Sequence, residues 1–126
     1  MPRRAILVVE DDLDTREMLR EVLGIEGYRV RVAEDGVQAL RQLAGPERFA
    51  AVVLDLVLPE LDGRAVIAAM AGDAALRQVP VLAISASLPS GPLQVAAFFH
   101  KPFSLDDLLA GLARAHRGPD TRGLAR

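Results

Sequence analysis

The sequence predicts an α/β fold in which a five-stranded parallel sheet carries helices on both faces. Apolar, β-branched runs alternate along the chain with segments of helical periodicity, which is the pattern of consecutive β/α units. Several of these runs are apolar without alternation, as expected for strands that helices cover on both sides. With 126 residues and 51% hydrophobic content, the chain can form one compact domain around a single core.

Five segments have the composition of strands. The first, third and fourth are almost continuously apolar, so we expect them at the centre of the sheet. The predicted strands are Ala5 to Val9, Tyr28 to Ala33, Ala50 to Leu56, Val79 to Ser85, and Ala97 to His100.

Four segments have the apolar spacing of helices. In the last of them, Ser104 precedes Asp107 by three residues, as at a helix N-cap, and four leucines then recur at helical spacing. The first three helices are expected at about Asp14 to Ile25, Gly36 to Ala44, and Arg64 to Ala71. Their predicted apolar stripes are Met18, Leu19, Val22 and Leu23, then Val37, Leu40 and Leu43, then Val66, Ala69 and Met70.

The connection between the fourth and fifth strands breaks the alternation. Residues 86–96 remain for it, which is close to the minimum of about 10 to 12 residues that a crossover with its own helix needs. The stretch also contains Pro89, Gly91 and Pro92, which interrupt helices. We therefore expect the fourth helix of the series to be shortened or missing.

Composition and charge exclude several classes of protein. No apolar run approaches the roughly 20 residues of a membrane-spanning helix, and the N-terminal sequence lacks the features of a secretory signal, so we expect a cytoplasmic protein without membrane contact. The absence of cysteine excludes disulfides and thiolate metal sites. A net charge of −2 without a basic cluster argues against direct nucleic-acid binding. Residues 1–117 are expected to form the domain, and 118–126 a flexible C-terminal tail.

Polar side chains follow the predicted strands where each strand ends. Glu10 and Asp11 follow the first strand, Asp55 the third, Ser85 the fourth and Lys101 the fifth. In an open parallel sheet, ligands bind beyond the carboxyl ends of the strands. We therefore expect these carboxylates, the hydroxyl and the ammonium to meet at one edge of the sheet.

This set of groups suits phosphoryl transfer. Clustered carboxylates repel one another unless a cation neutralises them, and oxygen ligands with room for water favour Mg²⁺. An ionised aspartate can attack phosphorus, while a lysine and a hydroxyl stabilise the transferred group. Lys101 is the only lysine among fifteen lysines and arginines, which indicates a position that needs a compact ammonium.

Four stretches together resemble the receiver domain of bacterial two-component response regulators. They are ILVVEDDLDTR at 6–16, VVLDLVLPELDG at 52–63, VPVLAISA at 79–86 and FFHKPF at 98–103. The resemblance extends from Arg4 to about Arg117 and implies a CheY-like, flavodoxin-like, doubly wound sheet with strand order 2-1-3-4-5. It also implies a sensor histidine kinase or histidine phosphotransfer protein as phosphoryl donor and a downstream protein as target.

The resemblance assigns a role to each collected residue. Asp55 matches the position that accepts the phosphoryl group, Ser85 the hydroxyl that binds it, and Lys101 the family's lysine. Glu10 and Asp11 match the acidic pair that holds Mg²⁺, and Asp55 and the Val57 backbone carbonyl complete the expected metal ligands. Phe98 matches an aromatic switch position, although a place in the core explains it equally well.

The expected protein is a stand-alone receiver, since the residues after Arg117 are too few for an effector domain. It phosphorylates and dephosphorylates itself but is not a metabolic enzyme, and it is a monomer or weak homodimer. One alternative is a protein-interaction module on the same fold that no longer uses phosphate, suggested by the short 86–96 segment. Another is a phosphatase of the haloacid dehalogenase type, but that class needs an acid where this chain has Val57.

Overall fold

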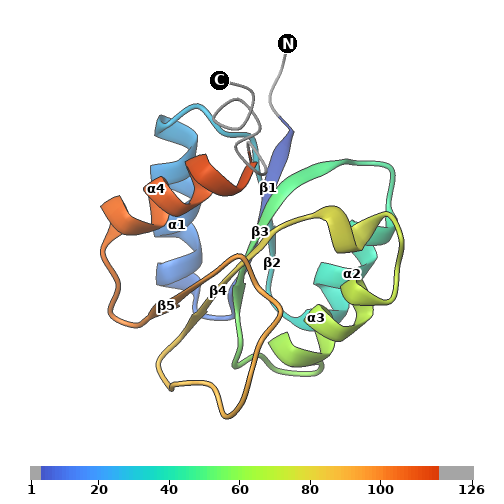
Figure 1. Ribbon diagram of the computed structural model, residues 1–126. Helices are drawn as coiled ribbons and strands as arrows, with labels where there is room; N and C mark the ends of the chain where they lie inside the picture. Colours follow the sequence, from blue (N-terminus) through green and yellow to red (C-terminus); the bar gives the residue numbers. More distant parts are fainter. Residues whose placement is uncertain (1–3, 117–126) are drawn as a thin grey trace, which may run out of the picture.

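The computed structural model describes residues 4–116, and the predicted tail, residues 118–126, lies outside that range. Five strands form one parallel sheet in the order β2-β1-β3-β4-β5, which confirms the predicted fold class (Figure 1). The strands are β1 Ala5–Val9, β2 Val30–Ala33, β3 Phe49–Asp55, β4 Val81–Ser85 and β5 Ala97–His100. The helices are α1 Leu13–Ile25, α2 Gly36–Ala44, α3 Gly63–Ala71, a 3-10 turn η1 Leu76–Gln78, and α4 Leu105–His116.

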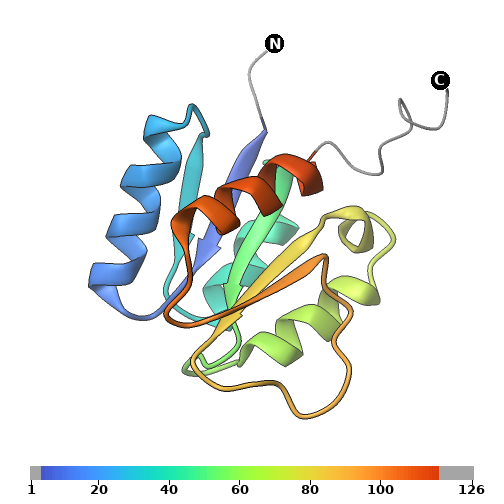
Figure 2. The same cartoon turned by 60° about the vertical axis from the view of Figure 1, so that its left-hand side comes forward.

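The helices divide between the two faces of the sheet. Helices α1 and α4 cover one face and α2 and α3 the other (Figures 1 and 2). Strand β1 is fully buried and sends Ile6 and Val8 to the first face and Leu7 and Val9 to the second, because successive side chains of a strand alternate. None of the helices between residues 4 and 116 is both long and apolar enough to span a membrane.

The predicted helix stripes are correct only in part. Met18 and Val37 are 37% and 38% exposed, and Ala69 is also exposed. In α1 the buried stripe consists of Arg16, Leu19 and Leu23, at spacings of three and four residues. Met18 is turned about 100° from Leu19 on the helix, which places it at the border of that stripe.

No helix occurs between β4 and β5 in the described part of the chain, as predicted. The connection is an extended loop that passes below the sheet in Figure 2. Leu93 and Val95 from this loop pack against the core on the α2 and α3 face, whereas Leu88 is 75% exposed. The last helix is therefore α4, although it occupies the place of a fifth helix in the β/α series.

Candidate functional site

The register of the strands brings the predicted site residues to one edge. Val9 pairs with Leu54, so Glu10 follows β1 at the level where Asp55 ends β3. Asp55 pairs with Ile84, and the next residue of β4 is Ser85. Ser85 in turn pairs with His100, which places Lys101 directly beyond β5. Residues that span 92 positions of the sequence, from Glu10 to Lys101, thus meet at the carboxyl edge of the sheet.

Lys101 connects the two buried carboxylates of this edge. Its Nζ donates to Glu10 Oε1 and to Asp55 Oδ2, each at 2.8 Å. Glu10 is fully buried and Asp55 is 4% exposed, so water cannot solvate either carboxylate well. A buried carboxylate is tolerated only when it is paired and hydrogen-bonded, and one ammonium here serves both.

Backbone amides bind the remaining oxygens of the same two carboxylates. Asp12 N–H donates to Glu10 Oε2 at 3.2 Å, and Val57 N–H donates to Asp55 Oδ1 at 2.9 Å. In each carboxylate, one oxygen therefore accepts a hydrogen bond from Lys101. The other oxygen accepts one from a backbone amide two residues further along the chain. These contacts fix the orientation of both side chains.

The electrostatics of the site reflect a competition between burial and pairing. Burial raises the pKa of Glu10, and the Lys101 and Asp12 hydrogen bonds offset only part of that effect. Burial alone would lower the pKa of Lys101, but its hydrogen bonds to Asp55 and Glu10 outweigh burial and raise it. Lys101 is therefore charged at neutral pH. Ionising Glu10 costs free energy because its carboxylate is buried.

Three carboxylates at this edge can hold a metal ion. One ligand oxygen from each of Glu10, Asp11 and Asp55 lies within 4.8 Å of the other two. Together with Lys101 the group carries a formal charge of −2, which one divalent cation would neutralise. Asp11 is exposed, so water can complete the coordination. An all-oxygen, partly hydrated donor set fits Mg²⁺.

Asp12 belongs to α1 rather than to the acidic cluster. Its carboxylate accepts from Thr15 N–H at 2.9 Å and from Thr15 Oγ1 at 2.6 Å, so it caps the helix. These hydrogen bonds lower the pKa of Asp12. The geometry therefore makes Asp12 the N-cap of α1.

A glycine allows α3 to begin directly against the strand that carries Asp55. A β-carbon on Gly63 would lie 2.6 Å from Leu56 Cα and 2.7 Å from the Asp55 carbonyl oxygen. Gly63 N–H also donates to Leu56 O at 3.0 Å. Gly63 therefore packs against the backbone of the site.

The remaining predicted residues occupy the expected places without contacts that define their roles. Ser85 is 2% exposed, and its Oγ accepts from Ser87 N–H at 3.1 Å. The Val57 side chain is 65% exposed, so this residue faces the site through its backbone. Phe98 is partly buried against the α2 and α3 core, and His100 is exposed. The roles of Ser85 and Val57 toward a phosphoryl group and a metal stay predictions.

Sequence reasoning overlooked Arg16. This arginine is only 8% exposed and shares the buried stripe of α1 with two leucines. The signal was present, because a charged residue three positions before Leu19 lies on the apolar face. Its hydrogen bonds reach the acidic turn after β1.

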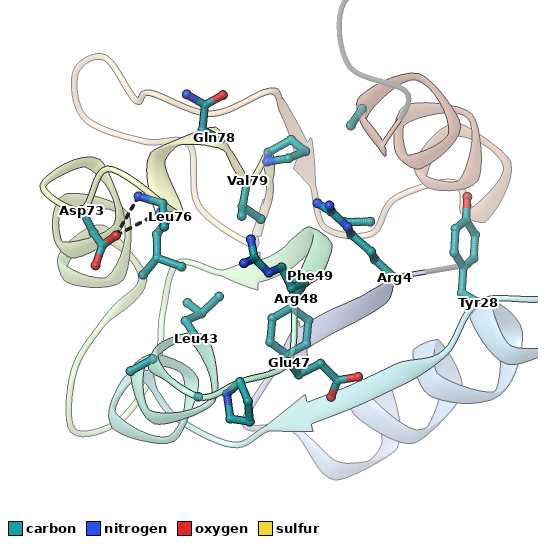
Figure 3. A pocket seen from close by; sticks show the side chains of 17 residues that line it. Arg4, Tyr28, Leu43, Glu47, Arg48, Phe49, Asp73, Leu76, Gln78 and Val79 are labelled. Carbon is teal, nitrogen blue, oxygen red and sulfur yellow. Dashed lines mark hydrogen bonds between the residues drawn. The ribbon is translucent and has the colours of Figure 1, made fainter. Parts of the chain in front are cut away.

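A different hollow, of about 930 Å³, lies at the amino ends of the strands, away from this edge (Figure 3). Phe49, Leu43 and Val79 line its interior. Its acids are engaged elsewhere, since Glu47 pairs with two arginines of β2 and the turn before it, and Asp73 accepts from backbone amides. We therefore place the chemistry at the carboxyl edge.

The family model described as the response regulator receiver domain matches residues 6–113 of the chain. A relative with the name response regulator MprA, from Mycobacterium sp. (strain KMS), is 40% identical over 138 aligned residues. That alignment covers 98% of this chain and 57% of the relative. MprA from Mycobacterium tuberculosis (strain ATCC 25177 / H37Ra) is also 40% identical, with 83% of this chain and 47% of the relative covered. The chain thus spans about half the length of these relatives.

Solved structures of similar chains agree with the fold. The receiver domain of a sensor histidine kinase from Pseudomonas aeruginosa PAO1 has a TM-score of 0.83 and 30% identity, covering 91% of this chain and 98% of that one. That structure holds a magnesium ion in its active-site cleft. The signal receiver domain of a histidine kinase from Syntrophus aciditrophicus also has a TM-score of 0.83, with 27% identity and coverage of 94% and 93%.

Proposed function

The chain belongs to the response regulator receiver domain family, and on that premise we propose that it accepts a phosphoryl group on Asp55 from a histidine kinase or histidine phosphotransfer protein. The observation that carries this proposal is the pair of 2.8 Å hydrogen bonds from Lys101 to Asp55 and Glu10 at the carboxyl edge. They place a buried aspartate next to an ammonium and beside two further carboxylates. Receiver domains are phosphoacceptor modules of signalling that pair with histidine kinases, and they are not metabolic enzymes.

In the proposed reaction, a carboxylate oxygen of Asp55 attacks the phosphorus of a phosphohistidine. A phosphorus–oxygen bond forms, the phosphorus–nitrogen bond breaks, and the imidazole leaves with the electron pair of that bond. Lys101 stays within reach of the new acyl phosphate and balances its charge, and the Ser85 hydroxyl donates to one of its oxygens. In the separate dephosphorylation step, a water oxygen attacks the phosphorus, the bond from phosphorus to the Asp55 oxygen breaks, and inorganic phosphate and the Asp55 carboxylate are released.

The metal expected here is Mg²⁺, held by Glu10, Asp11, Asp55 and the Val57 carbonyl. When bound, it would neutralise the acidic cluster and the charge of the phosphoryl oxygens. Hydrogen bonds orient two of these ligands: Lys101 and the Asp12 amide fix the Glu10 carboxylate, and the Val57 amide fixes that of Asp55. The exposed Asp11 leaves one side of the cluster open to water and to the incoming donor.

We propose that phosphorylation shifts the domain between two states and so changes its affinity for a downstream protein. We place this chemistry in the cytoplasm, with which the absence of cysteine agrees, and expect a monomer or weak homodimer without direct binding to nucleic acid or membrane. The stand-alone arrangement stays a prediction, because the relatives in the comparison are about twice as long.

The proposal is tested by intact mass after incubation with acetyl phosphate and Mg²⁺. We expect one phosphoryl adduct on the wild-type chain and none on Asp55→Asn or in the presence of EDTA. Circular dichroism of both proteins controls for folding. A stoichiometric adduct on folded Asp55→Asn would contradict the proposal, and beryllofluoride binding monitored by NMR covers the case of a short-lived adduct.

A second candidate function is a protein-interaction module that does not depend on phosphate. The observation that favours it is the connection between β4 and β5, which carries no helix in the described chain. Output through a helix at that place is therefore not available to this domain. This alternative predicts that a captured partner binds equally well with and without beryllofluoride, whereas the main proposal predicts at least a severalfold difference.

A further inference from the structure

Arg16 is a buried cation that contacts the backbone of the acidic turn of the site. The residue is 8% exposed and stands on the face of α1 that packs against the sheet. Burying an arginine is costly unless its donors are satisfied, and no buried side-chain nitrogen or oxygen of the described residues lacks a partner. The burial of Arg16 therefore indicates that its guanidinium has specific partners and is not part of a solvated helix surface.

The hydrogen bonds of Arg16 point to that task. Its Nη1 donates to the carbonyl oxygen of Glu10 at 3.0 Å and, at the 3.5 Å limit, to that of Asp11. These are the backbone groups of the two residues that supply carboxylates to the cluster. The contacts span six and five positions of the chain, so they fasten α1 to the turn between β1 and the helix.

Arg16 and Lys101 bind different groups of the same residue, Glu10. Lys101 Nζ binds the Glu10 carboxylate, whereas the Arg16 guanidinium binds the Glu10 main chain. A guanidinium presents several donors in a planar fork, so one group can serve two successive carbonyls while keeping its charge. A lysine at position 16 would offer a single point of contact on a flexible stem.

Glu34 is a third partner of Arg16. Arg16 Nη2 lies 3.7 Å from Glu34 Oε1, and the Glu34 side chain is 60% exposed. An ion pair at that distance whose acid is exposed to solvent contributes little. The Glu34 contact is therefore separable from the carbonyl contacts, which makes Glu34 a matched control.

We infer that Arg16 is a positioning residue that pre-forms the Glu10–Asp11 turn for a divalent cation. This inference rests on the proposed function only in the identity of the metal as Mg²⁺. Partners that orient metal ligands without touching the metal commonly change metal affinity by about 10- to 100-fold when removed. Arg16 touches no carboxylate of the cluster, so its loss should weaken metal binding without removing a group from the phosphoryl-transfer step.

The test is calorimetric titration of Mg²⁺ into the wild-type chain and the variants Arg16→Gln, Arg16→Lys and Glu34→Gln. We expect a dissociation constant about tenfold or more above wild type for Arg16→Gln, an intermediate value for Arg16→Lys, and no change for Glu34→Gln. At saturating Mg²⁺ the rate of phosphorylation by acetyl phosphate should return to within about twofold of wild type. A merely structural role would not produce this separation of affinity from rate.

A second readout uses the metal-free protein. The Asp12 N–H that donates to Glu10 Oε2 should exchange with solvent faster in Arg16→Gln and Arg16→Lys, while amides of β3 keep their protection. If Arg16→Gln does not fold, Arg16→Lys carries both measurements. Mg²⁺ affinity within twofold of wild type in folded Arg16→Gln or Arg16→Lys overturns the inference.

The outcomes separate this inference from the proposed function. A wild-type chain that binds Mg²⁺ and loses affinity in Arg16→Gln, but takes no phosphoryl group, contradicts the proposed function alone. Normal phosphorylation with Mg²⁺ affinity that does not depend on Arg16 contradicts the inference alone. A wild-type chain that binds no Mg²⁺ at millimolar concentration contradicts both.

Discussion

Replacing Lys101 by methionine should destabilise the metal-free protein much more than breaking a surface ion pair. The Lys101 ammonium makes two 2.8 Å hydrogen bonds to carboxylates that are buried, and hydrogen bonds to charged groups contribute about 1.5 to 3 kcal/mol each. The Lys101 side chain is 25% exposed, so water recovers part of that sum. We expect a net loss of about 3 kcal/mol, since two buried carboxylates would lose the ammonium that pairs with both.

The control variant is Arg20→Met, which breaks the exposed Arg20–Glu17 pair. Its N–O distance of 2.6 Å is shorter than either Lys101 contact, but both side chains are about half exposed. Such a pair is worth about 0.5 kcal/mol. The comparison therefore tests whether burial, and not distance alone, determines the effect.

The assay is urea and thermal unfolding in EDTA, both followed by far-ultraviolet circular dichroism because the chain has no tryptophan. At about 4 °C per kcal/mol, the melting temperature of Lys101→Met should fall by roughly 12 °C. Added Mg²⁺ should stabilise Lys101→Met more than wild type, because the cluster has lost its own cation. A Lys101→Met loss no larger than that of Arg20→Met would refute the reasoning.

Three further predictions follow from the same geometry. Burial raises the pKa of Glu10 above its ordinary 4.5. Metal-free wild type should therefore lose stability relative to Glu10→Gln as the pH rises through that raised value. Urea midpoints measured across a pH series would detect this loss. Gly63→Ala should lower the free energy of unfolding by about 1 to 3 kcal/mol because its β-carbon meets backbone atoms. Gly24→Ala, whose β-carbon would have nothing within 4 Å, should raise it by up to about 1 kcal/mol. Equal melting temperatures of the two variants would contradict this. Asp12→Ala should lower the melting temperature through loss of the α1 cap, with calorimetric Mg²⁺ affinity close to wild type.

The sequence predicts most of the site because parallel strands convert chain order into spatial position. Asp55, Ser85 and Lys101 each follow an apolar run, and the carboxyl ends of such runs must meet at one edge. The missing helix was equally predictable, since residues 86–96 are few and contain two prolines. The site could be predicted from the pattern of apolar runs, and the missing helix from the length and proline content of the connection.

What the sequence does not reveal depends on side-chain reach and close packing. Arg16 looks like one of many surface arginines until its stripe is shown to face the sheet. The need for Gly63 arises from a backbone contact between α3 and the end of β3, which no local pattern encodes. Met18 and Val37 were placed in the core because apolar periodicity cannot resolve the border of a stripe.

The most direct test of the account is to identify the carboxylate that carries the phosphoryl group. The chain would be incubated with acetyl phosphate and Mg²⁺, the acyl phosphate trapped by borohydride reduction, and the modified residue located by tandem mass spectrometry. The account predicts reduction at Asp55 alone, and no modified peptide without Mg²⁺. Modification at Glu10 or Asp11 in place of Asp55 would contradict it.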